Sequence, residues 1–490
     1  MLVFVALMWP LRHGFTDDGF IHIQYARNIA TSGEYSFNPG HVSFGTTSPL
    51  WVIVLAAIGR VFGAGEGLIV WSRVLSWAAG IGSLWAMRVL AGRLRLDTWA
   101  TSLAVIALAA HAWHVRWTAL SMETSSSVLA VIAVAIAALG AHEDSRRAWL
   151  LGVCMALASL IRPEAYLLVP VYGVAFALTP GRRWGCLART LIAFAALVLP
   201  WLVFAKVHIG HFLPNTAGAK SGGFDVHPAA LAARFQPIAK IVGASEGLFV
   251  IAIVVALFTR RFRSVLVDGG RLFLLLWVVA LPVAYAVLDI QVLSRYLLLT
   301  SPITIVLGFV ALQSLFDREG AFSFDGRRVT VAVTTLTVCF NMVLYFGVVL
   351  KPSREFSYDL THRLKSLALF IHDNSDDDAV VAAADIGYLA FYSRRYVLDL
   401  GGLVDDVTSR LCQSHPYEEI VEEGLFLDLP EYPRVAYFID RELLPNRFDG
   451  RTVKGYRFES LRVDEIRNLG IRKPGPIFYT LYRLRRDDDA

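Results

Sequence analysis

Long apolar stretches alternate with short polar segments along the first 350 residues of the chain. Apolar runs separated by arginine clusters are typical of membrane-spanning helices, each of which needs about 20 residues. Besides Met1 to Leu11 and 48–63, the apolar segments are 67–92, 98–113, 125–141, 148–161, 165–178, 190–206, 246–259, 270–288, 295–316 and 328–350. The pattern predicts a transmembrane domain over residues 1–350 with about eleven spans, the shorter of which include flanking residues.

The pattern changes abruptly after residue 350. Residues 351–490 carry charges throughout and have short β-branched runs such as Ala379 to Ala383 and Tyr396 to Leu398. Short runs of this type are typical of strands in a mixed sheet. We therefore expect a polytopic α-helical membrane protein with a C-terminal α/β domain outside the membrane, over residues 351–490.

Composition agrees with the membrane class. The 490 residues are 56% hydrophobic and 18% charged, with a mean hydropathy of +0.52, which is more apolar surface than a soluble core hides. The net charge of +5 comes from short basic clusters between apolar runs, so it does not indicate a nucleic-acid partner. The four cysteines are too far apart for a disulfide framework or a metal site.

The segment 48–63 decides the predicted topology. If it lies flat on the membrane as an interfacial helix, five arginine clusters fall on one side, which the positive-inside rule assigns to the cytoplasm. These clusters are Arg88 to Arg95, Arg146 and Arg147, Arg182 to Arg189, Arg260 to Arg271, and Arg318 to Arg328. The Asp17-Asp18 loop, the 114–124 and 207–245 loops and the C-terminal domain are then extracytoplasmic. Met1 to Leu11 is too short for a full span, so we expect that Met1 lies inside a longer first helix.

The adjacent acids Asp17 and Asp18 follow this first apolar stretch. Carboxylates at a membrane boundary must be hydrated, paired or used, so the pair is a candidate functional site. Helix capping by Thr16 or Asp17 is the structural alternative and explains one acid better than two. The two roles are compatible, because a helix N-terminus keeps a carboxylate ionised.

Further polar motifs lie in the same predicted outer loops and in the C-terminal domain. They are Arg27-Asn28, Phe37-Asn38-Pro39-Gly40, Thr46-Thr47-Ser48, Ser121-Met122-Glu123-Thr124, Arg162-Pro163-Glu164, Leu213-Pro214-Asn215-Thr216 with Ala219-Lys220, Ser294-Arg295-Tyr296, Asp385-Ile386-Gly387-Tyr388 and Asp399-Leu400-Gly401-Gly402-Leu403. With the Asp17-Asp18-Gly19 loop, this order resembles the GT-C membrane glycosyltransferases that use polyprenyl-phosphate sugars, including protein O-mannosyltransferases and aminoarabinose transferases. The chain is most similar to actinobacterial arabinofuranosyltransferases of the terminal β-1,2 type.

The resemblance implies inverting transfer of a sugar, such as arabinofuranose, from a polyprenyl-phosphate donor to a hydroxyl of a cell-envelope glycan, lipid or protein. Such a transfer needs a base for the acceptor proton and cations for the departing phosphate. The resembling families place the base in the first loop, which implies Asp17, with Asp18 as second choice. No cofactor is required, and a divalent cation is compatible with the reaction but not indicated, since the donor carries one phosphate.

The remaining candidates have structural alternatives of similar weight. Glu123 is either a supporting acid or a polar turn residue, and His22 is more often a packing histidine than a proton carrier. Arg162, Lys220 and Arg295 are candidates for phosphate binding, although such residues commonly anchor at lipid headgroups and Arg162 can simply pair with Glu164. Asn215 and Tyr296 are candidates for the donor or acceptor loop. The 207–245 loop is equally compatible with a mobile flap and with a plain connection.

Two other function classes remain open. A proton-coupled transporter or lipid flippase predicts charges at mid-membrane depth and paired halves, whereas the charges here lie at loop ends and no second half repeats the first. A catalytically idle glycan-binding scaffold would not need the two acids. The Asp385 and Asp399 motifs are interpreted as turns that follow strands.

Overall fold

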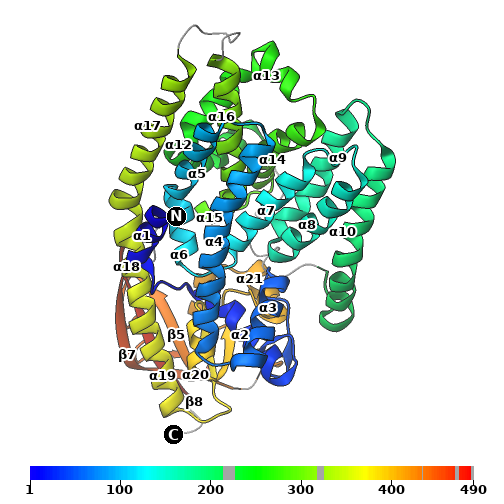
Figure 1. Ribbon diagram of the computed structural model, residues 1–490. Helices are drawn as coiled ribbons and strands as arrows, with labels where there is room; N and C mark the ends of the chain where they lie inside the picture. The colour runs from blue at the N-terminus through cyan, green and yellow to red at the C-terminus, as the bar shows by residue number, and fades with distance from the viewer. Residues whose placement is uncertain (213–226, 317–324, 433, 469–473, 487–490) are drawn as a thin grey trace. The chain divides into compact units, whose positions relative to one another are not determined.

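The computed structural model of the protein describes residues 1–212, 227–316, 325–432, 434–468 and 474–486, and it is mostly helical (Figure 1). The chain divides into two compact units. Unit 1 comprises Met1–Arg12, Arg73–Leu202 and Ser221–Leu350, and unit 2 comprises His13–Ser72, Val203–Lys220 and Lys351–Ala490. Residues 13–72 belong to the unit that holds the sheet, together with residues 351–490.

Unit 1 is built from helices. They are α1 (Leu2–Met8), η1 (Trp9–Leu11), α4 (Gly67–Arg93), which begins in unit 2, α5 (Thr98–Ala109), α6 (Ala112–Ala119), α7 (Thr124–Ala138), α8 (Ser145–Ile161), η2 (Pro163–Leu167), α9 (Leu168–Leu178), α10 (Trp184–Phe204), α12 (Pro228–Leu257), α13 (Arg260–Val265), α14 (Gly269–Val287), α15 (Ser294–Leu297), α16 (Ser301–Phe316), α17 (Gly326–Leu344) and η4 (Tyr345–Val349).

Five helices in the described part of the chain are long and apolar enough to cross a membrane: Gly67–Arg93, Trp184–Ile209, Pro228–Leu257, Gly269–Val287 and Gly326–Asn374. Six further apolar helices have 10–17 residues, and Pro49–Phe62 is one of them. The expected total of about eleven spans therefore stays a prediction. The helix expected at 48–63 is present and is shorter than a span requires.

Asn341 of α17 joins three helices inside unit 1. Its Oδ1 accepts a hydrogen bond from the backbone N–H of Ala112 at 2.9 Å, and its Nδ2 donates to the Ser245 carbonyl at 2.7 Å. The side chain is 1% exposed, so both bonds are shielded from water. They fix the start of α6, the helix that carries Arg116.

Unit 2 combines two N-terminal helices with a C-terminal α/β part. Its elements are α2 (Asp17–Ser32), β1 (Ser36–Asn38), β2 (His41–Val42), α3 (Pro49–Phe62), η3 (Ala205–Ile209), α18 (Leu350–Asp359), η5 (Leu360–Leu364), α19 (Lys365–Asn374), β3 (Val380–Ala383), α20 (Gly387–Ser393), β4 (Tyr396–Asp399), α21 (Asp406–Ser414), α22 (Tyr417–Glu422), β5 (Val435–Glu442), β6 (Thr452–Val453), β7 (Tyr456–Asn468) and β8 (Pro474–Arg486).

The main sheet has six strands in the order β4-β3-β5-β8-β7-β6. Strand β3 pairs in parallel with β4 and β5, and β8 pairs antiparallel with β5 and β7. Along β3, Val380 and Ala382 share one face and join a buried cluster with Phe438 of β5 and Ile420 of α22. The mixed sheet expected for the C-terminal residues is therefore present.

Candidate active site

The acid pair lies in the first turn of helix α2, in unit 2. Thr16 precedes the helix, and its side-chain oxygen accepts a hydrogen bond from the Gly19 N–H at 3.1 Å. Thr16 is therefore the N-cap, and Asp17 and Asp18 follow it as half-buried residues. Capping thus accounts for Thr16 and leaves both carboxylates to be explained.

Asp17 instead holds a second helix of the same unit. Its Oδ2 accepts from the Gly387 N–H at 3.0 Å and its Oδ1 from the Tyr388 N–H at 2.9 Å. A Cβ at position 387 would lie 2.1 Å from the Asp17 carbonyl oxygen, so only glycine allows this approach. The motif Asp385-Ile386-Gly387-Tyr388 therefore meets the first-loop acid at the start of α20.

A third carboxylate influences this position. Asp385 accepts two hydrogen bonds from Nη1 of Arg441, at 2.8 and 2.7 Å, and one from the Tyr479 hydroxyl. Burial, together with the charge of Asp385 and to a lesser extent that of Asp18, raises the pKa of Asp17 to about 7, although the two N–H bonds oppose the shift. Asp17 therefore titrates near neutral pH.

Neither Arg441 nor Tyr479 was expected at the site. They lie on strands β5 and β8. The alternation of apolar and polar residues along a strand predicts which face of the sheet a side chain lies on, but not which residue it contacts.

Asp399 has the role that the sequence predicted, in a turn that follows a strand. Its carboxylate accepts from the N–H groups of Gly401, Leu403 and Val404 and so stabilises the turn after β4.

The other first-loop motifs tie that loop to its own unit. Asn38 exchanges two hydrogen bonds with the backbone of Val397, both at 3.0 Å, and so adds to the edge of β4. Arg27 donates from Nη1 to the Phe391 carbonyl at 2.8 Å. His22 is buried and lies 2.7 Å from the Thr46 hydroxyl through Nδ1, which agrees with a packing role.

Unit 1 contains a separate group of charges in which Arg162 lies between two glutamates. Its Nη1 donates to Glu123 at 2.8 Å, and its Nη2 and Nε donate to Glu164 at 2.7 and 3.2 Å. The Arg162 and Glu123 side chains are 6% and 3% exposed. The pairing of Arg162 with Glu164 expected from the sequence is therefore confirmed, and it engages the donors that a phosphate would need.

Two further arginines of unit 1 lie over the same indole ring. The guanidinium carbons of Arg116 and Arg295 are 4.7 and 5.3 Å from the Trp117 ring centre. Arg295 also lies 5.3 Å from the ring of Tyr296, and the Trp117 indole donates to Ser294 at 2.9 Å. Burial and the charge of Arg295 lower the pKa of Arg116 to about 10. Two buried guanidinium groups thus lie beside the same ring, and their combined positive charge favours an anion nearby.

Two predicted residues, Asn215 and Lys220, lie outside the described residues. Within the ranges that are described, no group of three or more His, Cys, Asp and Glu side chains is arranged to hold a metal ion.

Sequence comparison matches the C-terminal part of the chain to a family model. Residues 354–472 match a family model described as a domain of unknown function (DUF8728). No curated protein matches the sequence.

Similar solved structures come from glycosyl-group transferases. ArnT from Cupriavidus metallidurans, bound to undecaprenyl phosphate, aligns over 98% of this chain and 96% of its own, with 14% identity and a TM-score of 0.59. The oligosaccharyltransferase of Archaeoglobus fulgidus aligns over 90% of this chain and 69% of its own, with 13% identity and a TM-score of 0.56. AftD, a mycobacterial arabinofuranosyltransferase, aligns with 14% identity over 98% of this chain and 41% of its own, at a TM-score of 0.48. The GT-C fold expected from the sequence is confirmed.

Proposed function

We propose that the protein is an inverting membrane glycosyltransferase that moves a sugar from a polyprenyl-phosphate donor to a hydroxyl group of a cell-envelope glycan, lipid or protein. The fold likeness carries this proposal, because it extends over nearly the whole chain to a structure that holds undecaprenyl phosphate. A pentofuranose such as arabinofuranose is proposed as the transferred sugar because the order of the motifs resembles that of arabinofuranosyltransferases.

The base is assigned to the acid pair. Asp17 is the first choice, since a base works best when its pKa lies near the operating pH and that of Asp17 is raised to about 7. Asp18, its half-buried neighbour, is the second choice. In either case the acceptor hydroxyl loses its proton to the carboxylate as its oxygen attacks the sugar carbon, and the bond to the donor phosphate breaks.

The donor phosphate is assigned to Arg295 together with Arg116. These two guanidinium groups lie 5.3 and 4.7 Å from the Trp117 ring centre, and Arg295 and Arg116 are 6% and 8% exposed, so a phosphate there would be bound largely without competition from water. Arg162, already held by two glutamates, is better suited to fixing Tyr296, whose ring lies 5.1 Å from its guanidinium carbon. Lys220 stays a sequence-based candidate for the same phosphate.

Membrane topology is part of the proposal. We expect about eleven spans in the plasma membrane, with α3 on its outer surface and unit 2 outside the cytoplasm. We also expect chelation of divalent cations to leave the rate unchanged, because a single donor phosphate can be stabilised by arginine alone.

The test measures release of polyprenyl phosphate by the purified protein with polyprenyl-phosphate sugars and candidate acceptors. Asp17→Asn should lower the rate per folded molecule by about 10²–10⁴-fold. Asp376→Asn, at an exposed acid of the same unit, is the matched control and should keep full activity. Full activity in the double variant Asp17→Asn/Asp18→Asn would exclude the mechanism.

One observation favours transport as a second candidate function. Glu246 is 1% exposed within α12, a candidate membrane span, and its Oε2 lies 3.3 Å from Nε2 of His111. Buried ionisable groups inside spans often carry protons. Proteoliposomes that show proton-coupled substrate flux, lost in Glu246→Gln, would support transport; acceptor glycosylation that persists in that variant would support the transferase.

A further inference from the structure

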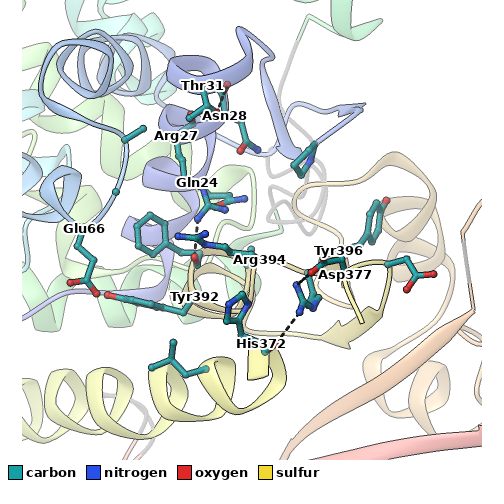
Figure 2. Close-up of a pocket in the computed structure, with 18 residues that line it drawn as sticks. Gln24, Arg27, Asn28, Thr31, Glu66, His372, Asp377, Tyr392, Arg394 and Tyr396 are labelled. Carbon is teal, nitrogen blue, oxygen red and sulfur yellow. Dashed lines mark hydrogen bonds and ion pairs between the residues drawn. The ribbon is translucent and has the colours of Figure 1, made fainter. Parts of the chain in front are cut away.

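Unit 2 contains a large open cavity between helices α2, α19 and α20 and the start of β4 (Figure 2). Its volume is about 1060 Å³. Sites for small molecules usually measure roughly 300–1,000 Å³, so this one has room for an oligosaccharide. Glu66, which precedes α4, also lines it.

Two arginines in this cavity have no acidic partner among the described residues. Arg27 donates through Nη1 to a backbone carbonyl and stacks on the Phe391 ring at 4.9 Å, which leaves its other N–H donors available. Arg394 is exposed at the end of α20 with a φ of 54°. Glycine normally occupies this left-handed position, so Arg394→Gly can remove the side chain without straining the backbone.

The remaining charges of the cavity are mostly paired. Arg395 binds Asp377 at 2.8 Å, and Glu66 binds Lys365 at 2.7 Å. Asp378 is exposed, and His372 contacts the Ser393 carbonyl through Nδ1. The positive charges of Arg27 and Arg394 therefore exceed the negative charge of Asp378, so the unpaired charge of the cavity is positive. Burial and the charge of Arg394 lower the pKa of Arg27 to about 10, and a bound anion would relieve this repulsion.

Aromatic rings complete the lining. Tyr392 and Tyr396 are half-buried and both border the cavity, as Figure 2 shows. A half-buried tyrosine offers an apolar face and a polar hydroxyl, a combination suited to sugar rings. Cations beside such rings favour a sugar that carries a negative charge.

The cavity is connected to the acid pair by two helices. Asp17 begins α2 and holds the first residues of α20, while Arg27 and Arg394 lie at the far parts of these helices. A helix rises 1.5 Å per residue, so Arg27 is about 15 Å along the axis from Asp17. A ligand in the cavity is thus separated from the acids by the length of several sugar units.

We propose that this cavity binds the distal part of the acceptor, and that this part is a sugar whose carboxylate or phosphate lies between Arg27 and Arg394. The identification of the ligand as an acceptor rests on the proposed function, whereas the preference for an anionic sugar does not.

The test measures equilibrium binding to the full-length protein in detergent without donor. The probes are tri-galacturonic acid, the neutral trigalactoside and a phosphate-bearing trigalactoside, so that the carboxylate and phosphate arms are separate. We expect an anionic trisaccharide to bind at least about tenfold more tightly than the neutral one. Arg394→Gly, which fits the left-handed backbone, should remove this preference, whereas Arg410→Ala, at an exposed arginine outside the cavity, should keep it.

Equal affinity for neutral and charged probes would overturn the proposal, as would unchanged anion preference in Arg394→Gly or an equal loss in Arg410→Ala. Charge-selective binding without any sugar transfer would support the anionic site while counting against the transferase. Transfer to a neutral acceptor without charge-selective binding would support the transferase and count against the anionic site.

Discussion

Arg162 in unit 1 and Asp17 in unit 2 are both buried or half-buried charges, but they are held by different groups. Carboxylates on both sides of the Arg162 guanidinium neutralise it, with contacts of 2.7 and 2.8 Å. Asp17 is held by two backbone N–H groups, which orient it without cancelling its charge. The first arrangement stabilises a fold, whereas the second leaves a group that can exchange a proton near neutral pH.

Replacing Arg162 should give the largest effect on stability. Arg162→Met removes the ion pairs that Arg162 makes with the buried Glu123 and the half-buried Glu164, and breaking a buried pair in this way costs about 3–5 kcal/mol. The unfolding temperature in detergent, detected by the loss of soluble protein on heating, measures this change in stability.

Arg295→Gln is the matched variant within unit 1. Arg295 contacts the rings of Trp117 and Tyr296, and such contacts contribute less free energy than a buried ion pair. The Arg295→Gln protein should therefore retain most of its thermal stability while its affinity for polyprenyl phosphate falls. If Arg295→Gln lowers stability as much as Arg162→Met, the distinction between a structural and a binding arginine is wrong.

Asn38 tests whether backbone hydrogen bonds also anchor the first loop. Asn38→Ala removes both hydrogen bonds to Val397 and should destabilise unit 2 by about 2 kcal/mol, since each bond contributes roughly 1 kcal/mol. Asn374→Ala, at an exposed asparagine that bonds within its own helix, is the control. Limited proteolysis of the 33–48 segment should accelerate in the first variant only; equal acceleration in both would contradict this anchoring role.

Much of the architecture could be predicted from the sequence because it depends on local patterns. Apolar runs indicated the helices, β-branched runs indicated β3 and β4, and the order of motifs indicated the GT-C fold. The number of membrane spans could not be predicted from the sequence in the same way, because α5, α7 and α16 are shorter than a bilayer requires and would need flanking residues to cross it.

Contacts between distant parts of the chain were not predictable. Asp17 and Gly387 are separated by 370 residues, and no local pattern indicates that residues 13–72 pack with the sheet-bearing residues. Arg162 and Arg295 lie in two separate motifs and Arg116 lies in none, and only the folded chain shows that acids pair with Arg162 and that Arg116 lies beside the same ring as Arg295. Motif spacing therefore identified the candidate side chains but could not separate their roles.

The last prediction concerns pH and sharpens the contrast between the two regions. The pKa of Asp17 is 3.8 in the unfolded chain and rises to about 7 on folding, so the folded state binds more protons between these values. The contribution of Asp17 to stability is therefore full below about pH 4 and is lost as the pH rises to about 7. The turnover rate should instead rise with pH over this range, because the Asp17 carboxylate must be ionised to act as a base.

Unfolding temperatures between pH 4.5 and 8 should thus decline less steeply in Asp17→Asn than in the native protein, and the native rate should rise with an apparent pKa near 7. Arg162→Met leaves Asp17 unchanged and should keep the native pH dependence of the rate, measured per folded molecule. A native rate that is constant across this range would remove Asp17 as the base and leave it as the residue that holds α20. The backbone N–H bonds would then stabilise unit 2 as the ion pairs of Arg162 stabilise unit 1.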